Sequence, residues 1–397
     1  MITVEEANQL IADHAKDFGV ETIPLEEGMD RILREPIVAD RDFPPYDRVT
    51  MDGIGITYAD YQAGTRSFMV SGVAAAGAEQ MSLHAPGECL EVMTGAIMPD
   101  GLDTVIPYEH VEIKDGVATL QVDQVNDQQN VHFKGLDRKQ GEAVVVPGKK
   151  IASPEIGVGA TVGKHEIQVS RLPKTLIISS GDELVEIYET PAAHQIRKSN
   201  VYRLKTVLKH YHIQVDTAHL LDDYDTIVKK LTSYLEEYEL IVVSGGVSKG
   251  KFDFLPKALE EVGVKKHFHR IAQRPGKPFW FGTRGETTVF AFPGNPVSSF
   301  MCVQQYFKPW LDQSLRVEPQ PQPMAVLGGD VTFKPDLTYF LEVKLDYTSE
   351  GQLLADPIKG NGSGDLANLV DADAFIVLPR GRELFKQGEV HPVIFYR

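Results

Sequence analysis

The sequence predicts a multidomain chain in which one α/β domain is joined to smaller, mainly β parts. Its 397 residues exceed what a single ordinary core holds, so two to four domains are expected. Residues 171–311 alternate short apolar runs with stretches of helical spacing. Residues 40–170 instead hold glycine-rich, short β-like runs, and further such runs follow a polar, proline-bearing linker at 312–324.

Composition and charge indicate a cytoplasmic protein. A net charge of −16 argues against nucleic acid or an anionic membrane as partner. No apolar run reaches the roughly 18 residues of a membrane span. Cys89 and Cys302 are far apart in sequence, which fits a reducing compartment. The N-terminus has Glu6 where a signal peptide would be basic, and Thr3 with Glu6 predicts the capping box of a docking helix.

The α/β region contains four predicted strands, at residues 175–179, 213–220, 240–244 and 287–292. Helical stretches lie between and after them, so the region predicts a mostly parallel sheet covered by helices on both faces. In such sheets, ligands bind beyond the carboxyl ends of the strands. The loops that follow these strands are therefore the first place to seek a site.

One of these loops, "SGGVSKGKFD", is rich in glycine. It nearly spells a P-loop, but Phe252 stands where the magnesium-binding hydroxyl belongs, which excludes that motif. Free backbone N–H groups at Gly245 and Gly246 are suited to cradle an anion. A plain strand-to-helix turn is the alternative.

A basic segment, "VKKHFHRIAQRPGKP", follows without a single acid. Pro275 and Pro278 bracket Gly276 and restrict the backbone, so Arg274 and Lys277 are expected to be held in place. A rigid pair of cations beside a glycine loop predicts binding of phosphate or another oxyanion. A solvated basic surface turn is the alternative.

Three acids, Glu183, Asp222 and Asp253, each follow a predicted strand. Hard carboxylate ligands close to a phosphate site indicate Mg²⁺. Asp222 and Asp253 also precede helices, so N-capping is the alternative for both.

Eight motifs in order make the chain resemble the MoeA and gephyrin E-domain family, the molybdopterin molybdenumtransferases. These are "PPYDRVTMDGIGI", "VMTGAIMPDGLDTVIPYE", "NVHFKGLDRKQGE", "SSGDEL", "IRKSNVYRL", "VVSGGVSKGKFDF", "RPGKPFWFG" and "FPGNPVSSF". The resemblance implies the final step of molybdenum cofactor synthesis, in which molybdate is inserted into adenylylated molybdopterin with Mg²⁺-dependent release of AMP. Two rival functions are a MogA-like molybdopterin adenylyltransferase and a non-catalytic, peptide-binding scaffold like the gephyrin E domain.

The resemblance also implies the architecture. It predicts an elongated homodimer whose cleft lies between the α/β domain of one subunit and modules of its partner. It also gives the upstream adenylyltransferase as an expected binding partner. Each subunit has a MogA-like, doubly wound α/β domain and three smaller, mainly β modules. The expected divisions are a discontinuous α/β domain (1–20 and 171–315), a linker β module (21–42 and 141–170), an inserted β-rich module (43–140) and a C-terminal β domain (320–397).

Site residues carry over from the family motifs position by position. The resemblance implies catalytic roles for Asp52, Thr94, Asp137, Glu183, Asp222, Asp253 and Lys277. It places substrate or oxyanion binding at Gly245, Gly246, Ser248, Arg274, Lys277, Pro278, Ser298 and Ser363, and Mg²⁺ at Asp253, Asp222 and Glu183.

Two positions depart from the family pattern. Arg274 stands where relatives usually have Lys, so a flat fork replaces a point charge. Glu342 stands where relatives commonly have an arginine proposed to help bind molybdate. An acid at that position should repel an oxyanion.

Overall fold

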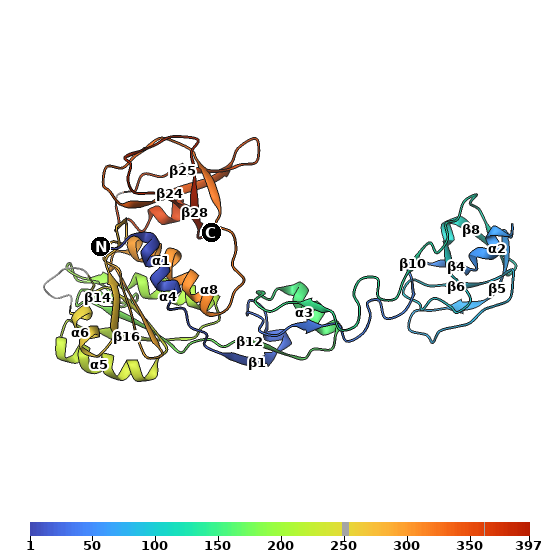
Figure 1. Ribbon diagram of the computed structural model, residues 1–397, viewed down its shortest axis with the longest axis horizontal. Coiled ribbons are helices and arrows are strands. Elements are labelled where there is room, and N and C mark those ends of the chain that lie inside the picture. The colour runs from blue at the N-terminus through green and yellow to red at the C-terminus, as the bar shows by residue number, and fades with distance from the viewer. Residues whose placement is uncertain (248–253, 361) are drawn as a thin grey trace.

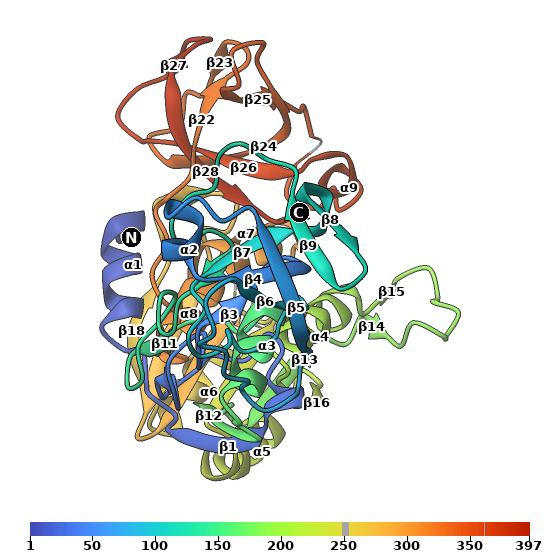
Figure 2. The same ribbon diagram turned by 90° about the vertical axis from the view of Figure 1, so that its right-hand side faces the viewer.

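The computed structural model describes residues 1–247, 254–360 and 362–397 of an elongated chain. Figure 1 shows an α/β domain beside a C-terminal β domain at one end, a small middle module, and a separate β module at the far end. The chain runs out to the far module and back again, so that module is an insertion. Figure 2, turned by 90°, shows the C-terminal domain stacked on the α/β domain and a two-stranded arm projecting sideways.

The α/β domain is built on a six-stranded sheet in the order β16-β13-β17-β21-β20-β18. The first four strands are parallel, and β20 runs antiparallel between β21 and β18. The four predicted strands are confirmed, whereas β20 and the edge strand β18 were not predicted. The bounds are β13 (Thr175–Ser180), β16 (Val215–Leu220), β17 (Leu240–Ser244), β18 (Lys265–His269), β20 (Trp280–Arg284) and β21 (Thr287–Phe292).

Helices cover both faces of this sheet, as predicted. Successive residues of a strand point to opposite faces, so Ile177 and Val242 belong to one buried cluster and Ile178 and Val243 to another. Helices α5 (Tyr224–Glu237) and α6 (Leu255–Glu261) pack on the second face. The first face is covered by α4 (Ser199–His210), α7 (Pro296–Cys302), the π-helix η3 (Val303–Phe307) and α8 (Lys308–Ser314).

Helix α1 (Val4–Ala12) begins with the predicted capping box, in which Thr3 Oγ1 accepts from Glu6 N and Glu6 Oε2 accepts from Thr3 N. Its buried residues share one cluster with Trp310 of α8, whose Nε1 donates to His14 O at 3.1 Å. The N-terminal helix therefore completes the core of a domain that is otherwise encoded far downstream.

Two β modules lie beyond this domain. The middle one pairs β1 with β12 and β2 with β11, beside α3 and the 3-10 turn η1. The far one has a six-stranded sheet in the order β7-β4-β6-β5-β9-β8 and a short β3–β10 pair. The bounds are β1 (Val20–Pro24), η1 (Leu25–Glu27), β2 (Ile37–Val38), β3 (Arg48–Val49), β4 (Gly53–Ile56), α2 (Tyr58–Gln62), β5 (Ser67–Ala74), β6 (Glu88–Val92), β7 (Thr104–Pro107), η2 (Tyr108–His110), β8 (Val111–Lys114), β9 (Val117–Leu120), β10 (Val131–His132), β11 (Ala143–Val145), α3 (Ser153–Thr161) and β12 (Glu166–Ser170).

The C-terminal domain is a β ring. Its strands pair in the order β24-β25-β22-β28-β26, and β26 pairs again with β24. Strand β19 of the α/β region joins it beside β24. No helix in the described part of the chain is long and apolar enough to cross a bilayer. The remaining bounds are β14 (Leu184–Val185), β15 (Ile196–Arg197), β19 (Gln273–Arg274), β22 (Met324–Leu327), β23 (Val331–Thr332), β24 (Thr338–Tyr347), β25 (Leu353–Pro357), α9 (Asn368–Asp371), β26 (Ala374–Leu378), β27 (Leu384–Phe385) and β28 (Val390–Phe395).

Candidate functional site

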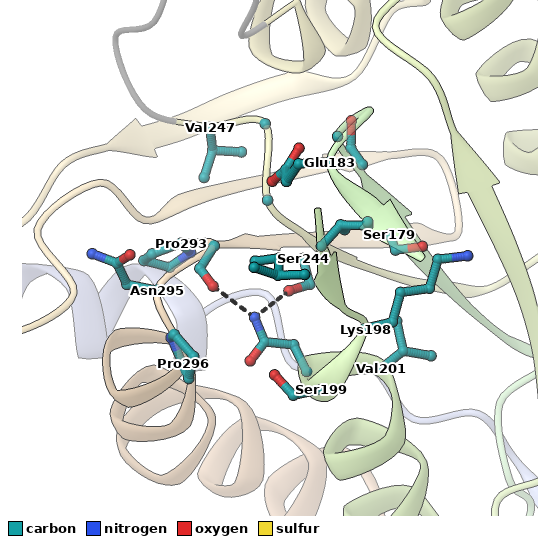
Figure 3. Close-up of a pocket in the computed structure, with 18 of the residues that line it drawn as sticks. Ser179, Glu183, Lys198, Ser199, Val201, Ser244, Val247, Pro293, Asn295 and Pro296 are labelled. Atoms are coloured by element: carbon teal, nitrogen blue, oxygen red, sulfur yellow. Dashed lines mark hydrogen bonds between the residues drawn. The ribbon is translucent and has the colours of Figure 1, made fainter. Parts of the chain in front are cut away.

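A cavity of about 400 Å³, the glycine-loop pocket, lies at the carboxyl ends of β13, β17 and β21. Five residues predicted for the site line it: Glu183, Asp222, Gly245, Gly246 and Pro278. Figure 3 shows Asn295 and Pro296 on one side of this pocket and Ser179 and Lys198 on the other. The pocket is where a ligand of a doubly wound sheet is expected.

The two glycines at the end of β17 are required by the backbone. Gly245 and Gly246 have φ of 96° and 70°, a region that side-chain-bearing residues rarely adopt. A Cβ on Gly245 would lie 2.8 Å from Ser180 O, and one on Gly246 would lie 2.5 Å from Leu255 Cδ1. The loop thereby brings bare backbone to the wall of the pocket.

Asn200, on α4, lines the same pocket and was not among the predicted site residues. Its Nδ2 donates to Ser244 Oγ at 2.9 Å and to Gly294 O at 2.8 Å, bonds that Figure 3 draws as dashed lines. Its Oδ1 is buried and has no hydrogen-bond partner among the described residues. Asn200 was not predicted because a single polar residue in a helical stretch gives no periodic pattern that marks it as a site residue. The motif "IRKSNVYRL" contains it and was the one available signal.

A second cavity of about 340 Å³, the interdomain pocket, lies between the α/β domain and the C-terminal domain. It contains the segment that we call the Arg-Lys loop, residues 274–278. Arg274, Lys277, Ser298 and Ser363 all line this pocket, which brings together residues from three separate parts of the sequence.

The two cations of the Arg-Lys loop are exposed and available. Within residues 1–247, 254–360 and 362–397, neither Arg274 nor Lys277 forms an ion pair within 4.0 Å. The guanidinium of Arg274 lies 5.9 Å from the centre of the Phe333 ring. In a chain of net charge −16, two unpaired cations at a cavity favour an anionic ligand.

Glu342 also lines the interdomain pocket. Burial raises the pKa of its carboxyl above the ordinary value, the charge of Asp365 raises it further, and Arg274 opposes the rise. The acid that was expected to repel an oxyanion thus lies at the predicted oxyanion pocket.

The two pockets adjoin, because Pro278, Pro293 and Asn295 line both. Asn295 Nδ2 donates to Ser363 Oγ at 2.9 Å, and Ser363 O accepts from Val297 N at 3.1 Å. These bonds fix the tail domain against the start of α7. The two cavities therefore share a wall made of Pro278, Pro293 and Asn295.

Three predicted residues lie elsewhere. Asp52 Oδ1 accepts from Thr94 N at 2.6 Å and from Thr94 Oγ1 at 2.7 Å, and these bonds, the backbone one first, lower the pKa of Asp52. Asp137 Oδ1 lies 3.0 Å from His132 Nε2. All three belong to the inserted segment, whose sheet lies at the opposite end of the molecule from the α/β domain in Figure 1. None of them lines either pocket.

Two predicted residues, Ser248 and Asp253, lie outside the described residues. Among the described residues, no group of three or more His, Cys, Asp and Glu side chains is arranged to hold a metal ion. Glu183 and Asp222 nevertheless line one pocket, so two of the three predicted carboxylates are at one site.

Family models match almost the whole chain in three consecutive pieces. The model described as "MoeA N-terminal region (domain I and II)" matches residues 2–163. "Probable molybdopterin binding domain" matches residues 176–313, and "MoeA C-terminal region (domain IV)" matches residues 324–396.

Individual relatives match along their full length. A molybdopterin molybdenumtransferase from Synechocystis sp. is 41% identical over 401 residues, which cover 99% of each chain. One from Staphylococcus aureus is 29% identical over 402 residues, which cover 99% of this chain and 95% of that protein. Two crystal structures of a molybdopterin biosynthesis MoeA protein from Pyrococcus horikoshii superpose with a TM-score of 0.83 at 28% and 26% identity, covering 100% of this chain and 99% and 100% of their own.

Proposed function

The chain belongs to the MoeA family of molybdopterin molybdenumtransferases, and we propose that it inserts molybdate into adenylylated molybdopterin, with release of AMP, at the end of molybdenum cofactor biosynthesis. The observation that carries this proposal is the pair of adjoining pockets. The glycine-loop pocket suits the phosphates of an adenylylated pterin, and the interdomain pocket suits a small oxyanion. Insertion of molybdate needs these two ligands side by side.

Binding in this proposal is divided between the two pockets. Backbone at Gly245 and Gly246 approaches the phosphates without side chains in the way. Arg274 and Lys277 take the molybdate dianion, and Ser298 and Ser363 flank it as polar partners. Holding the oxyanion beside the pterin turns an encounter in solution into a reaction within one site.

We include Mg²⁺ in the proposal because the donor set suits it. Glu183 and Asp222 present hard carboxylate oxygens to the glycine-loop pocket, and Asp253 is the third predicted ligand. When bound there, the ion would neutralise charge on phosphate oxygens as AMP leaves.

We also propose a homodimer, because one subunit does not bring the predicted residues together. Asp52, Thr94 and Asp137 lie in the inserted segment, whereas both pockets belong to the opposite end of the same chain. A second copy of the chain would supply Asp52, Thr94 and Asp137 to the pockets of the first. A cytoplasmic location and contact with the upstream adenylyltransferase complete the proposal.

The test is direct. The protein is incubated with adenylylated molybdopterin, Mg²⁺ and molybdate, and AMP is measured. AMP release that requires molybdate supports the proposal. Formation of adenylylated pterin from molybdopterin and ATP would instead indicate the adenylyltransferase reaction, and the absence of either reaction would favour a scaffold.

A further inference from the structure

A buried polar cluster lies directly behind the Arg-Lys loop. Gln273, Cys302 and Tyr306 are 0%, 0% and 1% exposed. The hydroxyl of Tyr306 donates to Gln273 Oε1, and Gln273 Nε2 donates to Gly276 O at 3.0 Å and lies 3.6 Å from Cys302 Sγ. The cluster thus runs from a helix to the backbone of the loop that presents the two cations.

The surroundings of this cluster are apolar. The ring of Tyr306 lies 5.2 Å from that of Phe279, and both belong to the largest hydrophobic cluster of the α/β domain. Polar groups in such a place are costly unless each has a partner, and here the two side chains satisfy one another. Apolar residues of similar size could fill this space without the cost of burying polar groups, so packing alone does not explain why Gln273 and Tyr306 are present.

The cluster contacts the backbone of the Arg-Lys loop at Gly276, where little space is left. Gly276 has φ of 85°, and a Cβ there would lie 2.6 Å from Cys302 Sγ and 2.8 Å from Gln273 Nε2. On the other side, Gln273 and Arg274 pair as β19 with Thr338 and Tyr339 of β24. The loop is held from one side by the tail domain and from the other by Tyr306.

Tyr306 belongs to the π-helical segment η3, between α7 and α8. Such segments are rare and often occur at functional sites, because the extra residue per turn redirects side chains. Helix α7, which leads into η3, begins at the interdomain pocket with Val297 and Ser298. One continuous helical stretch therefore touches the oxyanion pocket directly at its start and through Gln273 at its π turn.

We propose that Gln273 and Tyr306 are positioning residues that fix the Arg-Lys loop, so that Arg274 and Lys277 converge on a single oxyanion. The inference rests on the proposed function, since it takes molybdate as the oxyanion. Tyr306 does not line the interdomain pocket, whereas Gln273 does line it but is fully buried, with its amide bonded to protein groups. In the proposal Tyr306 orients the amide of Gln273, and that amide holds the carbonyl of Gly276 between the two cations.

The test uses Tyr306→Phe, which removes one oxygen atom. Binding of molybdate to the intact protein is measured by calorimetry, together with the Michaelis constant for molybdate and the turnover at saturation. We expect dissociation and Michaelis constants to rise about tenfold, since small misplacements of binding groups are costly, with saturated turnover within about twofold of wild type. Tyr211→Phe is the matched control, because its hydroxyl donates to Asp312 Oδ1 at 2.8 Å, away from the loop.

A double-mutant cycle adds a second readout. Gln273→Met removes the amide at similar volume, and Gln273→Met with Tyr306→Phe should weaken molybdate binding no more than either change alone, because the two groups act as a unit. If Tyr306→Phe does not unfold cooperatively, Gln273→Met alone carries the same binding test.

The outcomes separate the two proposals. Wild-type protein that folds but does not bind molybdate would overturn the proposed function. Wild-type binding, with Tyr306→Phe and Gln273→Met binding within about twofold of it, would overturn the positioning role. An equal loss of affinity in Tyr211→Phe would also overturn it, because the effect would then be one of general stability.

Discussion

Mixing two inactive variants tests whether the cleft is shared between subunits. Asp52→Asn alters the inserted segment, and Lys277→Ala alters the interdomain pocket. Both side chains are exposed, so the fold should survive both changes. In Asp52→Asn the new amide oxygen can still accept from Thr94, and only the charge is lost. Each variant alone should reduce AMP release roughly a hundredfold, the scale of losing one electrostatic contact in a transition state.

The magnitude of recovery follows from where the structure places these residues. Asp52 precedes β4 of the far module and Lys277 lines the interdomain pocket, and these two parts lie at opposite ends of one chain. In the proposed dimer each cleft therefore draws one of the two residues from each subunit. When the two variants are co-expressed equally, about half of the dimers are mixed, and one of the two clefts in each mixed dimer is intact. AMP release should therefore recover to about a quarter of the wild-type rate.

The assay is AMP release by the co-expressed and co-purified mixture, with dimers verified by sedimentation. Asp52→Asn mixed with Asp137→Asn is the control, because both changes affect the same contribution and no cleft becomes intact. Mixtures of Asp52→Asn and Lys277→Ala that stay as inactive as either parent would refute the shared cleft. A fully active monomer would refute it as well.

Four further substitutions test three residues. Glu342→Arg should lower the molybdate concentration for half-maximal turnover about tenfold, equivalent to about 1.4 kcal/mol, and an unchanged value would place the oxyanion elsewhere. Because the pKa of Glu342 is raised, wild-type molybdate affinity should increase as pH falls toward that pKa and the carboxylate becomes neutral, whereas Glu342→Gln should show no such dependence. Asp253→Asn should reduce AMP release by roughly two orders of magnitude without moving the Tm, and normal turnover at limiting Mg²⁺ would make it only a helix cap. The pKa of Asp17 is lowered chiefly by the hydrogen bond from Arg34, so its carboxylate should stabilise the fold above its unfolded pKa and lose that effect as the pH falls through its folded pKa. Asp17→Asn should therefore lower the free energy of unfolding by about 1 kcal/mol at pH 7 and by less in acid. An equal loss at both pH values would contradict the ion pair.

The sequence predicted those parts of the fold that depend on local patterns. Short apolar runs rich in β-branched residues located β13, β17 and β21 within about a residue, because such a run is typical of a strand that is buried on both faces. The capping box at Thr3 was also predicted from a local pattern, since its two partners, Thr3 and Glu6, are three residues apart. The basic character of "VKKHFHRIAQ" hid strand β18, whose alternation is interrupted by a register shift.

The candidate site was predicted as separate motifs rather than as an arrangement. Gly245, Arg274 and Lys277 are conspicuous in sequence, but no local pattern shows that the loop at 274–278 shares a pocket with Tyr339 and Ser363 of the tail. Asn200 and the Gln273–Tyr306 pair escaped prediction, because an isolated polar residue looks the same in sequence whether it is solvated or buried with a partner.

The position of α1 has a consequence for how the protein is made. This helix packs against α8, which is encoded about 300 residues later. At about 5–20 residues per second, the ribosome supplies that partner roughly 15–60 s after α1 has emerged. The inserted segment has its own buried clusters and can close during this interval, whereas Val4, Ala7 and Ile11 must wait. The first helix to be translated is thus among the last to be buried, and its apolar face stays open to chaperones while most of the chain is synthesised.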